Sequence, residues 1–167
     1  MTTLPSRGKS LLAFLFFFAV TWLAAVIGIL SSQNAPIIYK KIVQPSWAPP
    51  AYLFGPVWTT LYCLMAIAAW LVWRQRDRLR VNVCLGVYFV HLIFQAAWSG
   101  LFFGLGRADL AMIDIMLLWM MIVWLMLAFW RVDRLAGLLM LPYLLWVSFA
   151  SVLNGALWML NGGALPR

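Results

Sequence analysis

Long apolar runs, separated by short polar or proline-rich stretches, dominate the pattern of this sequence. Five of these runs carry almost no charge, and each is limited by charged residues, Pro or Gly. A bilayer core about 30 Å thick needs about 20 apolar residues in a helix that rises about 1.5 Å per residue. The pattern therefore predicts an all-α membrane protein, a bundle of five transmembrane helices with approximate spans 10–31, 53–73, 82–104, 109–130 and 136–160.

The connections between the spans differ in length. Residues 32–52 form one long connection, whereas the other three connections have only a few residues each. The N-terminus has Arg7 and Lys9 before an apolar run, which resembles a signal peptide. This run, residues 11–30, is longer than the roughly 7–15 apolar residues of a cleaved signal, so we predict a retained first helix. Residues 1–167 then form a single transmembrane domain.

Composition supports the membrane assignment and limits the partners. Of the residues, 66% are hydrophobic and 10% charged, against roughly 45–50% and 25% in soluble domains. The net charge of +8 comes from basic residues that lie between apolar runs and form no continuous stripe. We therefore expect anionic lipid headgroups, and no nucleic acid, as the counter-charge.

Cys63 and Cys84 lie inside apolar runs and have no CxxC spacing. This placement favours a role as small buried hydrophobic side chains over a disulfide or a metal site.

The distribution of Lys and Arg predicts the orientation. Eight lie on one side of the membrane: Arg7, Lys9, Arg74, Arg76, Arg78, Arg80, Arg131 and Arg134. Four lie on the other: Lys40, Lys41, Arg107 and Arg167. The positive-inside rule places the N-terminus in the cytoplasm and the long connection, with the C-terminus, outside. An outer or organellar membrane remains an alternative location, because proteins of those membranes need not obey the rule.

The third span has two distinct faces. Polar and aromatic residues recur at three- and four-residue steps, which is typical of one helix face: Tyr88, His91, Gln95, Trp98 and Phe102. Small residues recur on the roughly opposite face: Ala96, Gly100 and Gly104. Such a seam allows close approach of a helix, either from a second copy of the protein or from the same chain.

Single polar residues in the other spans are candidate interior groups. The fifth span carries Trp146, Ala150, Asn154 and Trp158 at four-residue steps, and Asn154 could bind a ligand or a neighbouring helix. Asp114 lies inside the fourth span, where a charge costs about 2.5–3.5 kcal/mol, so we predict that it faces inward. His91 has no thiolate or carboxylate companions, so no metal site is expected, and a hydrogen-bonded interior His is favoured over a haem-iron ligand.

The eleven tryptophans fall into two groups. Trp70, Trp73 and Trp130 lie at span ends and fit an interfacial belt. Others lie deeper: Trp58, Trp98, Trp119, Trp124, Trp146 and Trp158. An indole N–H in hydrocarbon needs a partner, so these either pack against polar groups or line a cavity for an aromatic ligand.

The long connection ends in a proline-rich segment. Residues 44–50 read Gln-Pro-Ser-Trp-Ala-Pro-Pro, and residues 53–62 continue Leu-Phe-Gly-Pro-Val-Trp-Thr-Thr-Leu-Tyr. Proline fixes φ near −65°, so the segment predicts a stiff, non-helical cap over the mouth of the bundle. A simple proline-rich spacer would explain the prolines but not the second Trp.

These residues resemble the TspO/MBR family, which includes the translocator protein, the tryptophan-rich sensory protein and peripheral-type benzodiazepine receptors. The loop pattern is met by Pro45, Trp47, Pro49, Pro50, Gly55, Pro56 and Trp58. Further matches are Trp98, Phe102, Phe103, Gly104, Asp114, Pro142, Tyr143, Trp146, Phe149, Ala150, Leu153 and Asn154. The sequence departs from the family at His91 and Gln95, where Gln and Asn are usual. It also has no Tyr after Asn154, which the cholesterol-recognition pattern of vertebrates requires.

The resemblance implies a five-helix bundle, often dimeric, with a pocket capped by the long connection. It implies porphyrins such as protoporphyrin IX and haem, sterols and benzodiazepine-type drugs as ligands, with no required cofactor. The implied ligand-binding residues are Trp47, Pro49, Pro50, Trp58, His91, Gln95, Trp98, Asp114, Trp146, Ala150 and Asn154.

Two functions remain open at this point. The first is a binder, sensor or carrier of porphyrins and related lipophilic molecules. The second is light- and oxygen-dependent degradation of protoporphyrin IX beside Trp58 and Trp146. Hydrolytic chemistry has no support, since there is no nucleophile motif. A proton-coupled transporter is disfavoured, because Asp114 has no evident intramembrane basic partner.

Overall fold

The computed structural model describes residues 6–76 and 80–162, and every regular element in these residues is a helix. Arg78 and Arg167, which entered the orientation prediction, lie outside the described residues. The long helices are α1 (Arg7–Ser31), α3 (Phe54–Trp73), α4 (Val81–Ser99), α5 (Ala108–Val132) and α6 (Arg134–Leu160). The short elements are α2 (Ala35–Lys41), the 3₁₀ turn η1 (Ala51–Leu53) and the π-helical turn η2 (Gly100–Gly104), which continues α4.

Five helical segments are long and apolar enough to cross a membrane, which confirms the predicted fold class. They cover residues 7–31, 51–73, 81–104, 108–132 and 134–160. Their limits agree with the predicted spans to within three residues. The chain is an integral, multi-pass membrane protein.

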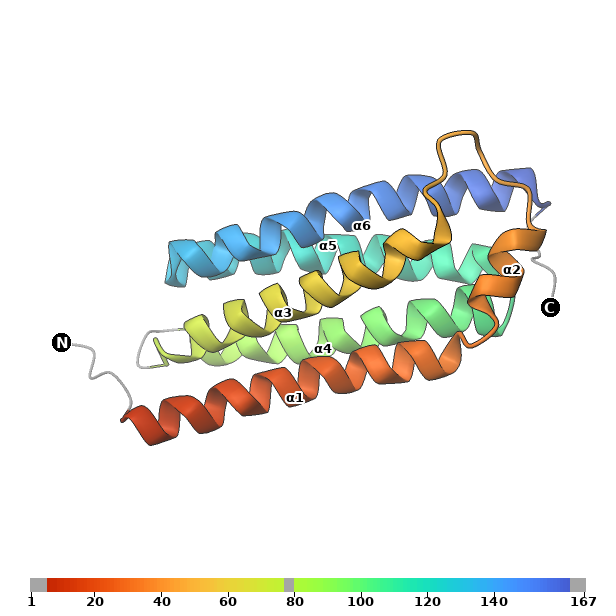
Figure 1. Cartoon of the computed structure of the whole chain (residues 1–167). Helices are drawn as coiled ribbons and strands as arrows, with labels where there is room; N and C mark the ends of the chain where they lie inside the picture. The colour runs from red at the N-terminus through yellow and green to blue at the C-terminus, as the bar shows by residue number, and fades with distance from the viewer. Residues whose placement is uncertain (1–5, 77–79, 163–167) are drawn as a thin grey trace.

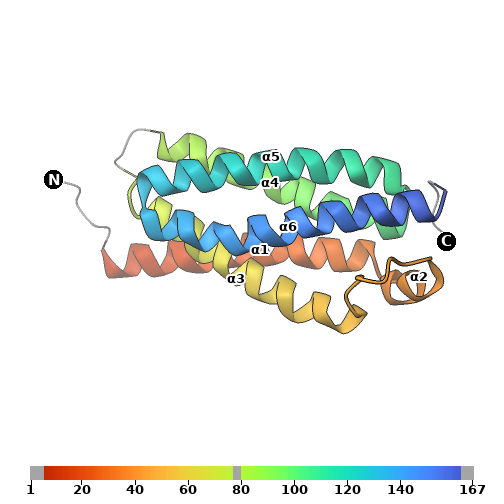
Figure 2. The ribbon, with the colours of Figure 1, turned by 90° about the horizontal axis from the view of Figure 1, so that it is seen from above.

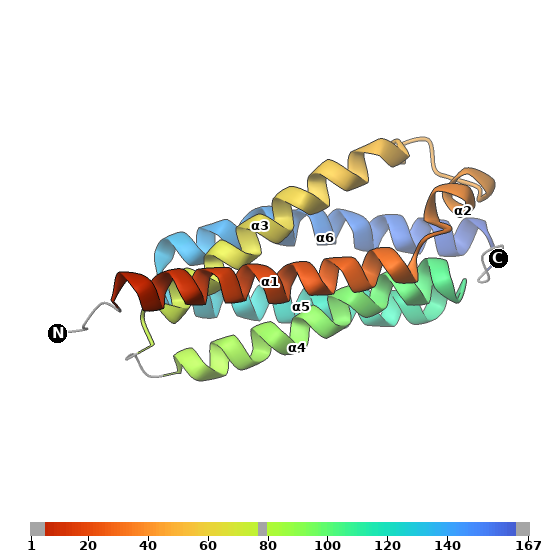
Figure 3. The same cartoon turned by 60° about the horizontal axis from the view of Figure 1, so that its bottom comes forward.

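The five long helices close into a ring. Helix α1 contacts α3 and α4, helix α5 contacts α4 and α6, and α3 contacts α6 (Figure 1). In Figure 3, α1 lies between α3 and α4, in agreement with these contacts. Helix α2 lies at the same end of the bundle as the C-terminal end of α6, whereas α1 begins at the opposite end (Figure 2). The long connection therefore belongs to one mouth of the bundle.

Helices α5 and α6 form a tight hairpin. Asp133 caps α6, because its side chain accepts hydrogen bonds from the backbone N–H groups of Leu135 (2.9 Å) and Ala136 (3.2 Å). A Cβ atom on Gly137 would lie 2.6 Å from Cβ of Trp130. Glycine at this position therefore allows the two helices to meet closely at the turn.

Helix α2 in the long connection was not predicted. Pro36 lies in its first turn, where the missing amide N–H costs little, and Ile38 and Tyr39 are buried. Residues 43–50 form no helix, as the prolines predicted. The connection thus combines a short packed helix with an extended, proline-rich segment.

Candidate ligand site

The long connection is anchored to the bundle and braced within itself. The side chain of Asn161 accepts a hydrogen bond from Val43 N (2.9 Å) and donates one to Val43 O (2.9 Å). Within the connection, the Tyr39 hydroxyl donates to Pro49 O (2.9 Å), and Gln44 Nε2 donates to Tyr39 O. Burial raises the pKa of Tyr39 above its ordinary value, so this hydroxyl stays protonated and able to donate at neutral pH.

Trp47 of the long connection and Phe54, the first residue of α3, contact aromatic rings of α6. The Trp47 ring meets Phe149 edge-on at 5.9 Å between centroids, and the Phe54 ring meets Trp146 edge-on at 5.8 Å. Trp47 remains 46% exposed, so this contact covers only part of the side chain. The cap therefore lies against α6 through aromatic contacts as well as through Asn161.

Trp58 of α3 points into the bundle. Its ring contacts Tyr62 (5.7 Å) and Tyr143 (6.3 Å). It lines an internal cavity of about 10 Å³ together with Gln95, Trp98, Ile115, Leu118, Val147 and Ala150. A cavity of this size holds about one water molecule. This cavity is consequently too small for a planar macrocycle.

Gln95 links three helices through buried hydrogen bonds. Its Oε1 accepts from the Tyr143 hydroxyl of α6 (2.7 Å), and its Nε2 donates to the Tyr62 hydroxyl of α3 (3.2 Å). Gln95 is 3% exposed, so neither bond competes with solvent. This side chain, selected from its helical spacing, is a structural crosslink at the level of the internal cavity.

His91 lies one turn from Gln95 and is fully buried. Its Nδ1–H donates to Tyr88 O, and its Nε2 has no partner within the described residues. The Tyr88 hydroxyl in turn pairs with Thr21 Oγ1 of α1 (2.6 Å). Thr21 was not among the predicted interior residues, although a lone hydroxyl in an apolar run was a usable signal.

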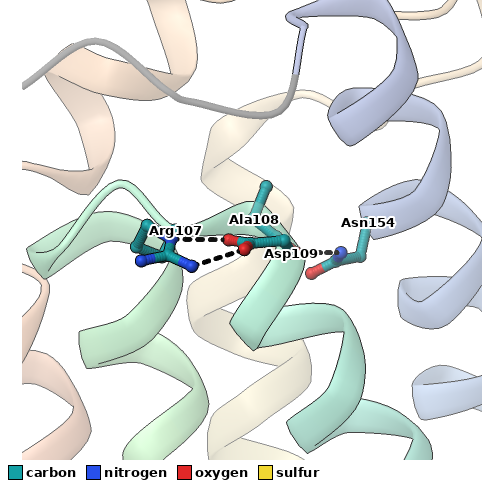
Figure 4. Close-up of polar contacts among 4 residues, drawn as sticks. All are labelled: Arg107, Ala108, Asp109 and Asn154. Atoms are coloured by element: carbon teal, nitrogen blue, oxygen red, sulfur yellow. Dashed lines mark hydrogen bonds and ion pairs between the residues drawn. The ribbon is translucent and has the colours of Figure 1, made fainter.

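Asn154 joins α6 to the beginning of α5 and to Trp98. It accepts a hydrogen bond from Trp98 Nε1 (3.2 Å) and donates to Ala108 O (3.2 Å; Figure 4). Next to this contact, Arg107 forms a forked ion pair with Asp109, with distances of 2.8 and 2.6 Å (Figure 4). The hydrogen bond to Asp109 raises the pKa of Arg107. Of the two roles considered for Asn154, binding to a neighbouring helix is the one that this conformation uses.

Asp114 faces inward, as predicted, and is 7% exposed. Its Oδ2 has no hydrogen-bond partner in the described part of the chain. Asp114 therefore carries an unused acceptor atom in the interior.

Four of the deeper tryptophans divide between two environments. Trp119 donates to Ser148 Oγ (2.8 Å), and Trp98 bonds Asn154, so these two pack against polar groups. Trp124 and Trp158 are 43% and 39% exposed. For these two the expectation of an interior position was wrong, because their side chains are turned outward from the bundle.

A larger hollow lies on the outer surface between α3 and α6. This groove of about 560 Å³ is lined by Pro56, Val57, Thr60, Leu61, Pro142, Leu145, Trp146 and Phe149. Several of its lining residues are exposed, Leu145 to 63%, so the groove opens toward the bilayer. We name this hollow the α3–α6 groove. Trp146 lines it, with an indole nitrogen that is covered and unpaired among the described residues.

The small-residue seam of the third span packs largely against α1. A Cβ on Gly104 would lie 2.8 Å from Ser31 O, and one on Gly100 would lie 3.4 Å from Ser31 Cβ. Ala96 is 8% exposed. A second outward groove, of about 420 Å³, lies between α1 and α4 and includes Ala96, Ala97 and Gly100 in its lining. Close packing within one chain is thus seen, and packing between copies stays a prediction.

The implied ligand-binding residues do not form one cluster. Four line the internal cavity: Trp58, Gln95, Trp98 and Ala150. His91, Asp114 and Asn154 are buried, Trp146 lines the α3–α6 groove, and Trp47, Pro49 and Pro50 lie in the connection. Within residues 6–76 and 80–162, no three His, Cys, Asp or Glu side chains come together in a metal-binding arrangement.

Comparisons with known proteins agree with this architecture. The model of the TspO/MBR family matches residues 13–159. The chain is 44% identical over 127 residues to Tryptophan-rich protein TspO of Chlorobaculum tepidum, covering 74% of this chain and 78% of that protein. It is 36% identical over 159 residues to Protein CrtK of Rhodobacter capsulatus, covering 94% and 98%. It is 35% identical over 127 residues to the human Translocator protein, covering 75% of each.

Proposed function

This chain belongs to the TspO/MBR family, and we propose from that premise that it binds porphyrins such as protoporphyrin IX and haem. In this proposal it is a membrane-embedded binder, sensor or carrier that takes its ligand from the lipid phase. Sterols and benzodiazepine-type drugs belong to the same class of flat or compact lipophilic ligands. No cofactor is required for this role.

The α3–α6 groove is the observation that carries the proposal. Its volume of about 560 Å³ lies within the roughly 300–1,000 Å³ of small-molecule sites, whereas the internal cavity does not. Trp146 and Phe149 offer aromatic faces to a planar apolar ring. A hydrophobic ligand reaches this groove sideways through the bilayer, without unfolding of the cap.

The mouth of the bundle provides partners for the carboxylates of a porphyrin. Lys40 and Lys41 are exposed at the end of α2, in the connection that also carries Trp47. Trp47 contacts Phe149, which lines the α3–α6 groove. A porphyrin with its ring in the groove and its carboxylates toward this end would satisfy both its apolar and its charged groups.

The test is a titration of the purified full-length protein with protoporphyrin IX, followed by the Soret absorbance. We expect saturable binding that Trp146→Phe weakens by about threefold to tenfold, because one aromatic contact is reduced. Trp124→Phe is the matched control, since Trp124 is 43% exposed on α5 and lines neither hollow. Equal weakening in both variants, or absence of saturable binding, would refute the proposal. If only Trp58→Phe weakened binding, the ligand would have to bind in the interior of the bundle and not in the α3–α6 groove.

The alternative function, degradation of protoporphyrin IX, is tested with the same mixture of protein and protoporphyrin IX. Illumination in the presence of oxygen would bleach the Soret band if the protein catalysed this reaction. A binder gives stable absorbance in light and in darkness. Bleaching that disappears in Trp58→Phe and Trp146→Phe would favour catalysis.

We also propose that the protein is a homodimer that meets through the groove between α1 and α4. Ala97 and Gly100 leave room there for a helix from a second copy. Ala97→Leu fills this groove from an exposed position, so it should reduce the dimer fraction measured by light scattering in detergent. An unchanged mass would contradict this interface.

We place the N-terminus in the cytoplasm of a bacterial cell and the cap outside. The support is the positive-inside rule applied to exposed cations such as Arg7, Arg131 and Arg134. Labelling of a cysteine introduced at Tyr52, which is 74% exposed beside the cap, distinguishes the two orientations in intact cells.

A further inference from the structure

Two arginines at the end of α3 are held over aromatic rings. The guanidinium carbon of Arg74 lies 5.0 Å from the ring centre of Trp70, and that of Arg76 lies 4.7 Å from the ring centre of Trp73. Both arginines are half-buried, and Nη1 of Arg76 is covered without a hydrogen-bond partner among the described residues. Stacking restricts these long side chains, so two positive charges are fixed at one edge of the bundle.

An aromatic strip continues from these arginines along the surface between α1 and α3. Trp70 donates its indole N–H to Ser10 O of α1 (3.0 Å), which fixes its ring. Its ring meets Phe14 edge-on at 5.4 Å, and Phe14 lies 4.6 Å from Phe18. Phe14 and Phe18 are half-buried and one helical turn apart, so the strip runs toward the membrane interior.

The combination of fixed cations and an apolar strip matches an amphiphile. We propose that this surface is a binding site for an anionic glycerophospholipid such as phosphatidylglycerol. Its headgroup phosphate bonds Arg74 and Arg76, and one acyl chain lies along Trp70, Phe14 and Phe18. A free anion would use only the two arginines, and a neutral lipid only the strip. We name these five residues with Trp73 the α1–α3 lipid site.

Charge at this end of the bundle supports the choice of ligand. The described cations there include Arg7, Lys9 and Arg80, all exposed, and the described carboxylate is Asp133, which caps α6. Asp77 follows Arg76 in the sequence and lies outside the described residues. The long-range field therefore attracts anionic lipid to this end, and the stacked arginines provide the specific contact.

The experiment uses the full chain, delipidated in a neutral detergent, with phosphatidylglycerol or phosphatidylcholine added and bound lipids counted by native mass spectrometry. We expect one retained phosphatidylglycerol and weaker retention of phosphatidylcholine. Each arginine near a phosphate contributes about 5.5-fold in affinity, so Arg74→Gln combined with Arg76→Gln should weaken phosphatidylglycerol binding by about 30-fold. Phe18→Ser should weaken both lipids by a similar factor, because the acyl chain loses its contact.

The control removes the same charge from the same end. Arg131 and Arg134 are exposed, and Arg131→Gln combined with Arg134→Gln should change the affinity by less than about threefold. If both double variants lost the same affinity for phosphatidylglycerol, general charge attraction would explain the binding and the proposed site would be wrong. Binding of inorganic phosphate alone with the same affinity as the lipid would also overturn it. Asp77→Asn should leave binding unchanged or stronger, and a 30-fold loss there would contradict the assignment. Circular dichroism confirms that each variant is folded.

Discussion

Asn161→Ala is the substitution with the most direct effect on the cap. Asn161 makes two hydrogen bonds to Val43, each 2.9 Å long, and these bonds join the C-terminal end of α6 to the long connection. Each is worth about 0.5–1.5 kcal/mol, so their loss should favour release of the connection by about 1–3 kcal/mol. The population with a released connection should rise by about 5-fold to 150-fold.

Trypsin reports this release directly. The bond after Lys41 precedes Ile42, which is 6% exposed, and Val43, whose backbone is occupied by Asn161. Cleavage requires that these residues leave the bundle, so its rate follows the released population. We expect cleavage after Lys40 and Lys41 to accelerate by the same factor in Asn161→Ala.

The controls separate release of the cap from general loss of structure. Cleavage after Arg74, at the opposite end of the bundle, should keep its rate. Asn34→Ala removes an exposed asparagine that makes no capping bond, and it should behave like the natural protein. Asn161→Asp retains the acceptor for Val43 N–H but loses the donor, so an intermediate rate is expected. An unchanged rate in Asn161→Ala, or equal acceleration after Arg74, would refute the reasoning.

Three further perturbations test the interior, the α5–α6 turn and the brace of the cap. In a double-mutant cycle of Gln95→Leu and Tyr143→Phe, unfolding in detergent should reveal a coupling free energy of about 1 kcal/mol, and additivity would contradict the hydrogen bond of 2.7 Å. Gly137→Ala should destabilise by about 1–3 kcal/mol in thermal unfolding, because its Cβ would lie 2.6 Å from the preceding helix, whereas Gly86→Ala, with open space around it, should not destabilise. Burial raises the pKa of Tyr39, so the stability gained over Tyr39→Phe should be complete below about pH 10 and disappear as pH rises through the higher folded-state pKa; a constant difference in melting temperature would contradict this.

Parts of the candidate site were predictable because they depend on one helix at a time. The three- and four-residue spacing placed Gln95, Trp98 and Asn154 on interior faces, and all three lie inside or beside the internal cavity. The resemblance to the TspO/MBR family implied one pocket that includes Trp58 and Trp146, and these two rings line separate hollows. Spacing defines a face of a helix, but it leaves open which neighbour that face meets.

Helix α2 illustrates a second limit. With seven residues it is too short for a periodic pattern, and an isolated helix of that length is marginal in water. Its Ile38 and Tyr39 are buried in one cluster with residues from η2, α5 and α6. These contacts come from distant parts of the chain, so local sequence could not reveal the helix.

The sequence by itself determined the five membrane spans, the proline-rich extended cap and the inward position of Asp114. The spans and the position of Asp114 follow from the solvent, because hydrocarbon requires about 20 apolar residues per helix and makes an outward-facing charge costly. The extended cap follows from the fixed φ of its prolines. The tertiary structure decided the pairing of Asn161 with Val43, the crosslink through Gln95 and the separation of the internal cavity from the α3–α6 groove. These features depend on the rotation and vertical offset of each helix, which are set by packing between side chains that are remote in sequence.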